Sequence, residues 1–132
     1  PDAAGGKKRL WPELRQLYPA VADPDALDVA ELKQRFLVRQ ALETARCFEE
    51  GVITDVREAD IGSILGFGFA PFTGGTLSYI EGMGLPAFVA LCQKLAKKHG
   101  ARFAPGRQLR RMANAGETFY GKFAPKADAR AA

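Results

Sequence analysis

The chain has 132 residues, a formal net charge of +4, a hydrophobic fraction of 47% and a charged fraction of 26%. This length and balance are typical of one globular domain with a real core, and they argue against a largely disordered chain. The mild positive charge does not indicate a nucleic-acid partner, because the aromatic residues lie in uncharged stretches and are not interleaved with the basic runs.

We expect the two ends of the chain to lie outside the folded part. Residues 1–24 are typical of a connector, with a Gly-rich start, a short helical turn from Pro12 and a loop. Because Pro1 is not an initiator Met, we expect the chain to be part of something longer. The helical domain is predicted over residues 25–125, and a disordered tail over residues 126–132.

A long helix is predicted to begin at Asp28, because Asp28 followed by Glu31 resembles a capping box. It should run to Glu50 and end at Gly51. Its apolar residues project onto two faces, so we predict a central helix that is sandwiched between neighbours. The broad face comprises Leu37, Val38, Ala41, Leu42, Ala45, Phe48 and Val52, and the narrow stripe comprises Val29, Leu32, Phe36 and Cys47.

Five charged residues form a row between those two faces: Arg35, Arg39, Glu43, Arg46 and Glu50. Arg39 with Glu43, and Arg46 with Glu50, have the i,i+4 spacing of helical ion pairs. The row is either a solvated ladder of ion pairs or a polar seam against a partner domain. The sequence leaves both interpretations open.

Residues 61–80 contain no charged residue and have the length of a membrane span, but glycines and Pro71 interrupt them. We therefore predict no membrane span. The pattern favours a helix over residues 58–65, a turn, and a helix over residues 73–81. The turn holds Phe67, Phe69 and Phe72, which we expect to contribute to an interface.

Two further helices complete the expected fold. An amphipathic pattern predicts one helix over residues 85–99, and Pro105 opens another that extends to about Ala113. Phe119 and Tyr120 are expected to fold the end of the last helix back onto the domain. No strand pattern occurs, so the sequence predicts a single compact all-α domain of four to five helices.

No arrangement of residues indicates catalysis, so we assign no catalytic, cofactor-binding or metal site. Gly66-Phe67-Gly68 starts a dinucleotide fingerprint, but Pro71 interrupts it and no strand precedes it. His99, the one histidine, is interpreted as a capping or surface residue. The adjacent Glu49 and Glu50 are interpreted as a solvated pair.

Cys47 and Cys92 are expected to be buried free thiols, which fits a reducing, cytoplasmic location. The spacing of the cysteines and the histidine does not suggest zinc. The remaining basic residues are more readily explained as surface residues, with a CoA- or acyl-CoA-binding module as the alternative. They are Lys7, Lys8, Arg9, Lys94, Lys97, Lys98, Arg107, Arg110 and Arg111.

A family resemblance spans about three quarters of the chain and lies in residues 35–52, 59–62, 66–75, 99–103 and 116–121. The resemblance is to the C-terminal helical domain of 3-hydroxyacyl-CoA dehydrogenases. It is strongest to the second, final copy of that domain in multifunctional β-oxidation enzymes, such as α subunits of fatty-acid oxidation complexes. The opening residues 6–12 resemble the connector that leads into that copy.

Multifunctional enzymes of this family also carry another, catalytic copy of the helical domain, and some residues here depart from the pattern of that copy. Gln34 stands where that copy typically has a substrate-contacting Asn, and Arg39-Gln40 stands where it has Pro-Tyr, whereas Glu43 matches. The resemblance implies that the catalytic His–Glu pair belongs to a separate NAD-binding domain. We therefore expect this chain to be inactive alone.

The resemblance also implies a role in a larger enzyme. The parent would oxidise (S)-3-hydroxyacyl-CoA to 3-ketoacyl-CoA with NAD, and this chain would be a non-catalytic packing module. Its expected partners are the preceding dehydrogenase and hydratase domains. An excised copy is expected to form a homodimer, unless the segment around Trp11 and Tyr18 folds back over its apolar surface.

Overall fold

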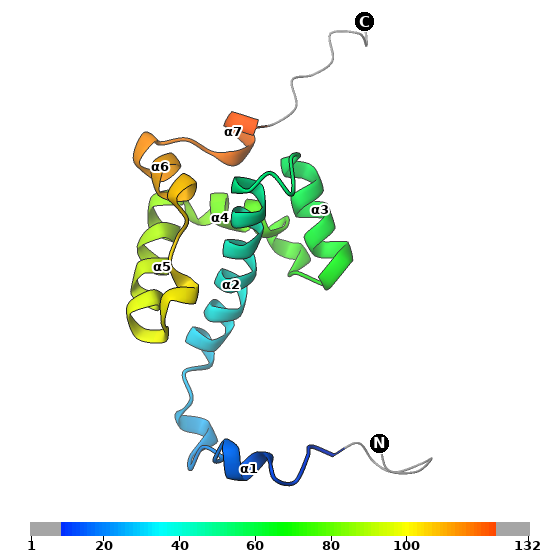
Figure 1. Cartoon of the computed structure of the whole chain (residues 1–132), viewed down its shortest axis with the longest axis vertical. Helices are drawn as coiled ribbons and strands as arrows, with labels where there is room; N and C mark the ends of the chain where they lie inside the picture. Colours follow the sequence, from blue (N-terminus) through cyan, green and yellow to red (C-terminus); the bar gives the residue numbers. More distant parts are fainter. Residues whose placement is uncertain (1–8, 124–132) are drawn as a thin grey trace, which may run out of the picture.

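Helix α2 (Val29–Glu49) runs through the middle of the computed structural model, which describes residues 9–123 (Figure 1). Within that range every regular element is helical, which confirms the all-α prediction. The other α-helices are α1 (Leu14–Leu17), α3 (Val56–Phe67), α4 (Thr76–Met83), α5 (Leu85–His99), α6 (Arg107–Ala115) and α7 (Phe119–Phe123). Three 3-10 turns lie at η1 (Pro24–Ala26), η2 (Pro71–Thr73) and η3 (Ala101–Phe103).

The helix ends follow local capping chemistry. The Asp28 carboxylate accepts from the Glu31 N–H at 2.9 Å, and Gly51 takes a φ of +73° at the far end of α2. Helix α5 has the predicted bounds, whereas α3 extends beyond its prediction at both ends. Helix α4 begins at Thr76, three residues later than expected from residue 73, because Gly74 and Gly75 both take positive φ. Helices α1 and α7, of four and five residues, are additional to the five longer ones.

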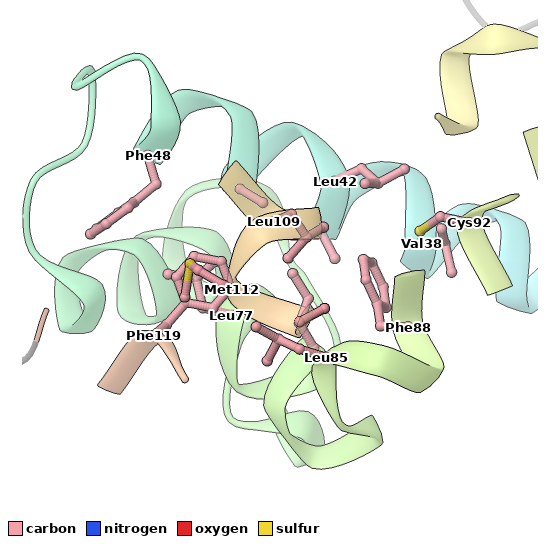
Figure 2. Close-up of a cluster of buried hydrophobic side chains, with 14 of the residues drawn as sticks. Val38, Leu42, Phe48, Leu77, Leu85, Phe88, Cys92, Leu109, Met112 and Phe119 are labelled. Atoms are coloured by element: carbon pink, nitrogen blue, oxygen red, sulfur yellow. The ribbon is translucent and has the colours of Figure 1, made fainter. Parts of the chain in front are cut away.

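The core forms where the broad face of α2 meets α4, α5, α6 and α7 (Figure 2). In Figure 2 the side chains from all these helices point toward one another beside α2. Fully burying a large apolar side chain stabilises a fold by roughly 1.5–3 kcal/mol. The members below 5% exposure include Val38, Leu42, Leu77, Ile80, Leu85, Phe88, Cys92, Leu95, Phe103, Leu109, Met112 and Phe119.

The prediction that α2 is sandwiched is wrong for this chain. Its broad face is covered as far as Phe48, although Val52, beyond the end of α2, is 71% exposed. On the narrow stripe, Val29 is 52% exposed and Phe36 is 69% exposed. The stripe is thus only partly covered by the described chain, since Leu32 and Cys47 are half-buried. Trp11 and Tyr18 do not cover it, since they are 57% and 72% exposed and α1 lies away from the bundle (Figure 1).

The expected tail over residues 126–132 lies outside the described residues, as do Lys7 and Lys8.

Candidate functional site

The charged row of α2 is partly a ladder of ion pairs. Glu43 accepts from Arg39 at 2.7 Å and from Arg46 at 3.4 Å, and these side chains are 37–47% exposed. Arg46 thus pairs with Glu43 and not with Glu50, which is exposed. Arg35 is half-buried and makes no ion pair with the described residues. Whether the row faces another domain stays a prediction.

The three phenylalanines of the central turn separate into two groups. Phe72 is 89% exposed and Phe67 is 56% exposed, and their place in an interface stays a prediction. Phe69 is only 1% exposed, because its ring packs edge-on against Tyr79 inside the domain, with centroids 6.0 Å apart. Phe69 therefore supports the turn from within and does not belong to an exposed surface.

Helix α3 carries a further exposed apolar face that the sequence reasoning missed. Ile61 is 58% exposed and Leu65 is 80% exposed, and their i,i+4 spacing places them together. Gly62 and Gly66 lie beside them, and a Cβ added to either glycine would meet nothing within 4 Å. We call these four residues the α3 face. The i,i+4 spacing was the available signal, but the apolar run hid it because both sides of α3 are rich in apolar residues.

A buried carboxylate joins α3, α4 and α7. Asp60 is 2% exposed, and its Oδ1 accepts from the backbone N–H of Leu77 at 2.7 Å and of Ser78 at 3.2 Å. Its Oδ2 accepts from the Ser78 hydroxyl at 2.6 Å and from the Tyr120 hydroxyl at 2.8 Å. Burial, with this bond to Asp60 next, raises the pKa of Tyr120. Asp60 thus caps the start of α4 from another helix, where a negative charge is favourable.

Gly75 makes that cap possible. A Cβ on Gly75 would lie 2.5 Å from Asp60 atoms, and its φ is +119°. Only glycine fits both constraints without displacing the carboxylate.

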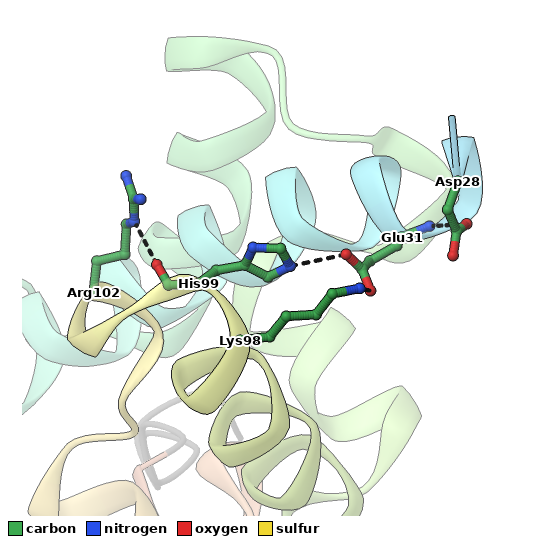
Figure 3. A network of polar contacts seen from close by, with 5 residues as sticks. All are labelled: Asp28, Glu31, Lys98, His99 and Arg102. Carbon is green, nitrogen blue, oxygen red and sulfur yellow. Dashed lines mark hydrogen bonds and ion pairs between the residues drawn. The ribbon is translucent and has the colours of Figure 1, made fainter. Parts of the chain in front are cut away.

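A second polar cluster ties the ends of α2 and α5 together (Figure 3). Glu31 accepts from Lys98 at 2.5 Å and contacts His99 Nε2 at 2.8 Å. The hydrogen bond from Lys98, followed by that from His99, lowers the pKa of Glu31. His99 is therefore half-buried and held by Glu31, and it is not a free surface residue.

The interpretation of Glu49 and Glu50 as a solvated pair is wrong for Glu49. Its Oε1 accepts from the Gln108 N–H at 2.9 Å, in the first turn of α6. Sequence distance hid this cap, since the two residues are 59 positions apart. Glu50 alone is exposed.

The other sequence assignments fall in ordinary surroundings. Cys92 is fully buried and Cys47 is half-buried, both as free thiols. The basic residues Arg107, Arg110 and Arg111 are exposed on α6.

Among residues 9–123, no three His, Cys, Asp or Glu side chains lie close enough together to hold a metal ion. No helix in the same range has both the length and the apolar character needed to cross a membrane.

Comparison with known proteins finds a relative that is much longer than this chain. No family model matches the chain. Over 93 residues, or 70% of the chain, it is 42% identical to the fatty acid oxidation complex subunit alpha of Shewanella amazonensis. The match covers 13% of that relative's length, so most of the relative has no counterpart here. The chain is thus similar to one segment of a fatty acid oxidation complex α subunit.

Proposed function

We propose that this chain is a non-catalytic packing module of a fatty-acid β-oxidation enzyme, corresponding to its final C-terminal helical domain. The observation that carries the proposal is the α3 face: a charge-free, exposed helix surface on a domain whose own core is already complete. The 42% identity to a segment of a fatty acid oxidation complex α subunit supports the enzyme class.

The two glycines of the α3 face strengthen this interpretation. A glycine inside an exposed helix costs about 1 kcal/mol relative to alanine. Among the described residues, neither Gly62 nor Gly66 is needed for a turn or a close contact. Glycines one helical turn apart do allow another backbone to approach closely. Their cost is explained if a partner helix packs on Ile61 and Leu65.

The partner is inferred to be another domain of the same parent protein. The parent would oxidise (S)-3-hydroxyacyl-CoA to 3-ketoacyl-CoA with NAD bound in a separate domain, and an enoyl-CoA hydratase domain would precede it. This module would hold those domains in position, and we infer a cytoplasmic location. Excised, it would pair with a second copy through the same face, because one self-complementary patch then serves both partners.

Leu65→Ser tests the face directly, with Leu10→Ser as the matched control. Both leucines are 80% exposed, but Leu10 lies in the segment before α1. Sedimentation equilibrium of the chain at roughly 100 μM should show self-association that Leu65→Ser weakens at least about tenfold, as loss of a buried leucine predicts. Leu10→Ser should leave the association unchanged. A monomer of 14.3 kDa for the unaltered chain would refute the pairing.

Gly62→Ala should have opposite effects on the stability of the monomeric chain and of the full-length parent enzyme. In the monomeric chain, at low concentration, it should raise the free energy of unfolding by about 0.5–1 kcal/mol, since alanine favours helix and the position is open. In the full-length parent enzyme it should lower thermal stability and the rate of NADH formation from 3-hydroxyacyl-CoA, because the added methyl keeps the partner away. A neutral or stabilising effect in the full enzyme would show that nothing packs on this face.

A further inference from the structure

A surface pocket of about 190 Å³ lies between the first half of α2 and η3. Its lining residues are Leu32, Arg35, Phe36, Arg39, Arg102 and Phe103. Half of them are arginines, the other half are apolar, and no acidic side chain lines the pocket. The combination is unlike an ordinary surface hollow, where charges of both signs usually mix.

The positive charge around this pocket is only partly compensated. Arg39 is paired with Glu43, but Arg102 uses its Nε–H on the His99 carbonyl, 3.2 Å away, and stands over the Phe103 ring at 5.9 Å. Neither Arg35 nor Arg102 has an ion-pair partner among residues 9–123. The pocket therefore presents net positive charge beside apolar walls.

Arg35 adds an unsatisfied donor. Its Nε–H is buried and has no hydrogen-bond partner in the described chain. Buried donors are almost always paired, so an orphaned guanidinium N–H in a pocket wall indicates that an acceptor belongs nearby.

The acidic residues nearest in sequence on α2 are already paired with other cations and make no bond to Arg35. Glu31 is held by Lys98 and His99 at the end of α5 (Figure 3), and Glu43 is held by the two arginines beside it on α2. Both are committed to bonds of 3.4 Å or shorter. The pocket therefore has room for an acceptor from outside the chain beside Arg35.

We propose that this pocket binds a small organic oxyanion: a carboxylate or phosphate monoester carried on a flat apolar group. Arginine forks suit either oxyanion because they donate two parallel N–H bonds. Phe36 and Phe103 provide the surface for the apolar part, and Phe36 is free to cover it because it is 69% exposed. The volume is below the roughly 300 Å³ at which drug-sized sites begin, which limits the ligand to about one ring with its anionic group.

Titration of the 15N-labelled chain by NMR tests the proposal at low ionic strength, where the attraction is least screened. The probes are benzoate, phenyl phosphate, inorganic phosphate and the neutral benzyl alcohol. Benzoate or phenyl phosphate should give saturable shifts at residues of the pocket, with a dissociation constant on the order of 1 mM. The tighter of the two identifies the oxyanion class.

Variants distinguish a built site from general positive charge. Arg35→Gln and Arg102→Gln should each weaken the organic anion roughly tenfold, the loss expected for one charge-assisted bond. The control is Arg110→Gln, which removes an exposed arginine of α6 that does not line the pocket. Arg102 is itself exposed, so its variant stays informative if Arg35→Gln fails to fold.

Three results would overturn the proposal. One is the absence of saturable shifts below about 20 mM anion, which is too weak for a formed site. The second is equal binding of benzyl alcohol, which would leave only an apolar hollow. The third is an equal loss of affinity in Arg110→Gln, which would leave only net charge.

Discussion

Replacing Asp60 by alanine removes the acceptor of four donors at once. The donors are the N–H groups of Leu77 and Ser78 and the hydroxyls of Ser78 and Tyr120. They lie at the start of α4 and on α7, so the substitution loosens two junctions of the fold. The space left by the carboxylate is enclosed, because Asp60 is 2% exposed.

The cost follows from how well each donor can find another acceptor. The two hydroxyls can rotate, whereas the two backbone N–H groups are fixed by α4. Each buried donor left unpaired costs about 1–3 kcal/mol, so Asp60→Ala should lower the free energy of unfolding by about 3–5 kcal/mol. For a domain of this size, that corresponds to a fall in Tm of roughly 10–20 °C.

Asp60→Asn should be much milder, for a geometric reason. Oδ1 accepts from both backbone N–H groups, whereas Oδ2 accepts the two hydroxyls and also shares the Ser78 N–H at 3.2 Å. An amide with its oxygen at Oδ1 keeps the backbone bonds, and the hydroxyls can rotate to accept from its NH₂. The charge at the start of α4 and the shared bond from the Ser78 N–H to Oδ2 are lost, which together cost about 1–2 kcal/mol.

Urea unfolding followed by circular dichroism measures these differences. Asp28→Ala is the matched control, since it removes an exposed N-cap of α2 and should cost about 1 kcal/mol. The reasoning is refuted if Asp60→Ala costs no more than that control, or if Asp60→Asn is as damaging as Asp60→Ala. If the alanine variant does not fold, the asparagine variant still tests the geometry.

The remaining predictions concern the same helix junctions and the two thiols. Gly75→Ala should destabilise the fold by about 3 kcal/mol or more, because its Cβ would meet Asp60 at 2.5 Å, whereas Gly51→Ala, in open space at φ +73°, should cost about 1 kcal/mol by urea unfolding. Glu31→Gln should lower the free energy of unfolding near neutral pH but not in acid. The hydrogen bond from Lys98 lowers the pKa of Glu31, so the stability that ionised Glu31 contributes is fully present above its ordinary pKa of 4.5. That stability is lost as the pH falls through the lowered pKa of the folded state. Urea midpoints of both proteins from pH 7 to pH 3 should therefore converge, and a constant difference would contradict the assignment. Burial raises the pKa of Cys92 to about 12, so at pH 8 a disulfide reagent should modify Cys47 in the folded chain and leave Cys92 unreacted until urea is added.

Much of the fold could be predicted from local sequence. The apolar periodicity, the cap at Asp28 and the stop at Gly51 predict helix α2, and all of them act within about one turn of helix. Helix α5 is predicted for the same reason, since Gly100 ends it and its apolar stripe is regular. These signals are short-range, so no knowledge of the rest of the molecule was needed.

The tertiary structure decided which polar and apolar groups meet. Glu49 caps α6 across 59 positions, and Glu31 meets His99 across 68, so neither pairing leaves a trace in local spacing. For the same reason Phe69 and Phe72 look alike in sequence, yet one is 1% and the other 89% exposed. Periodicity says that a helix has an apolar face but not whether a neighbour covers it, because coverage depends on where distant helices pack. Only the packed structure could therefore show that the α3 face and the arginine-lined pocket are open.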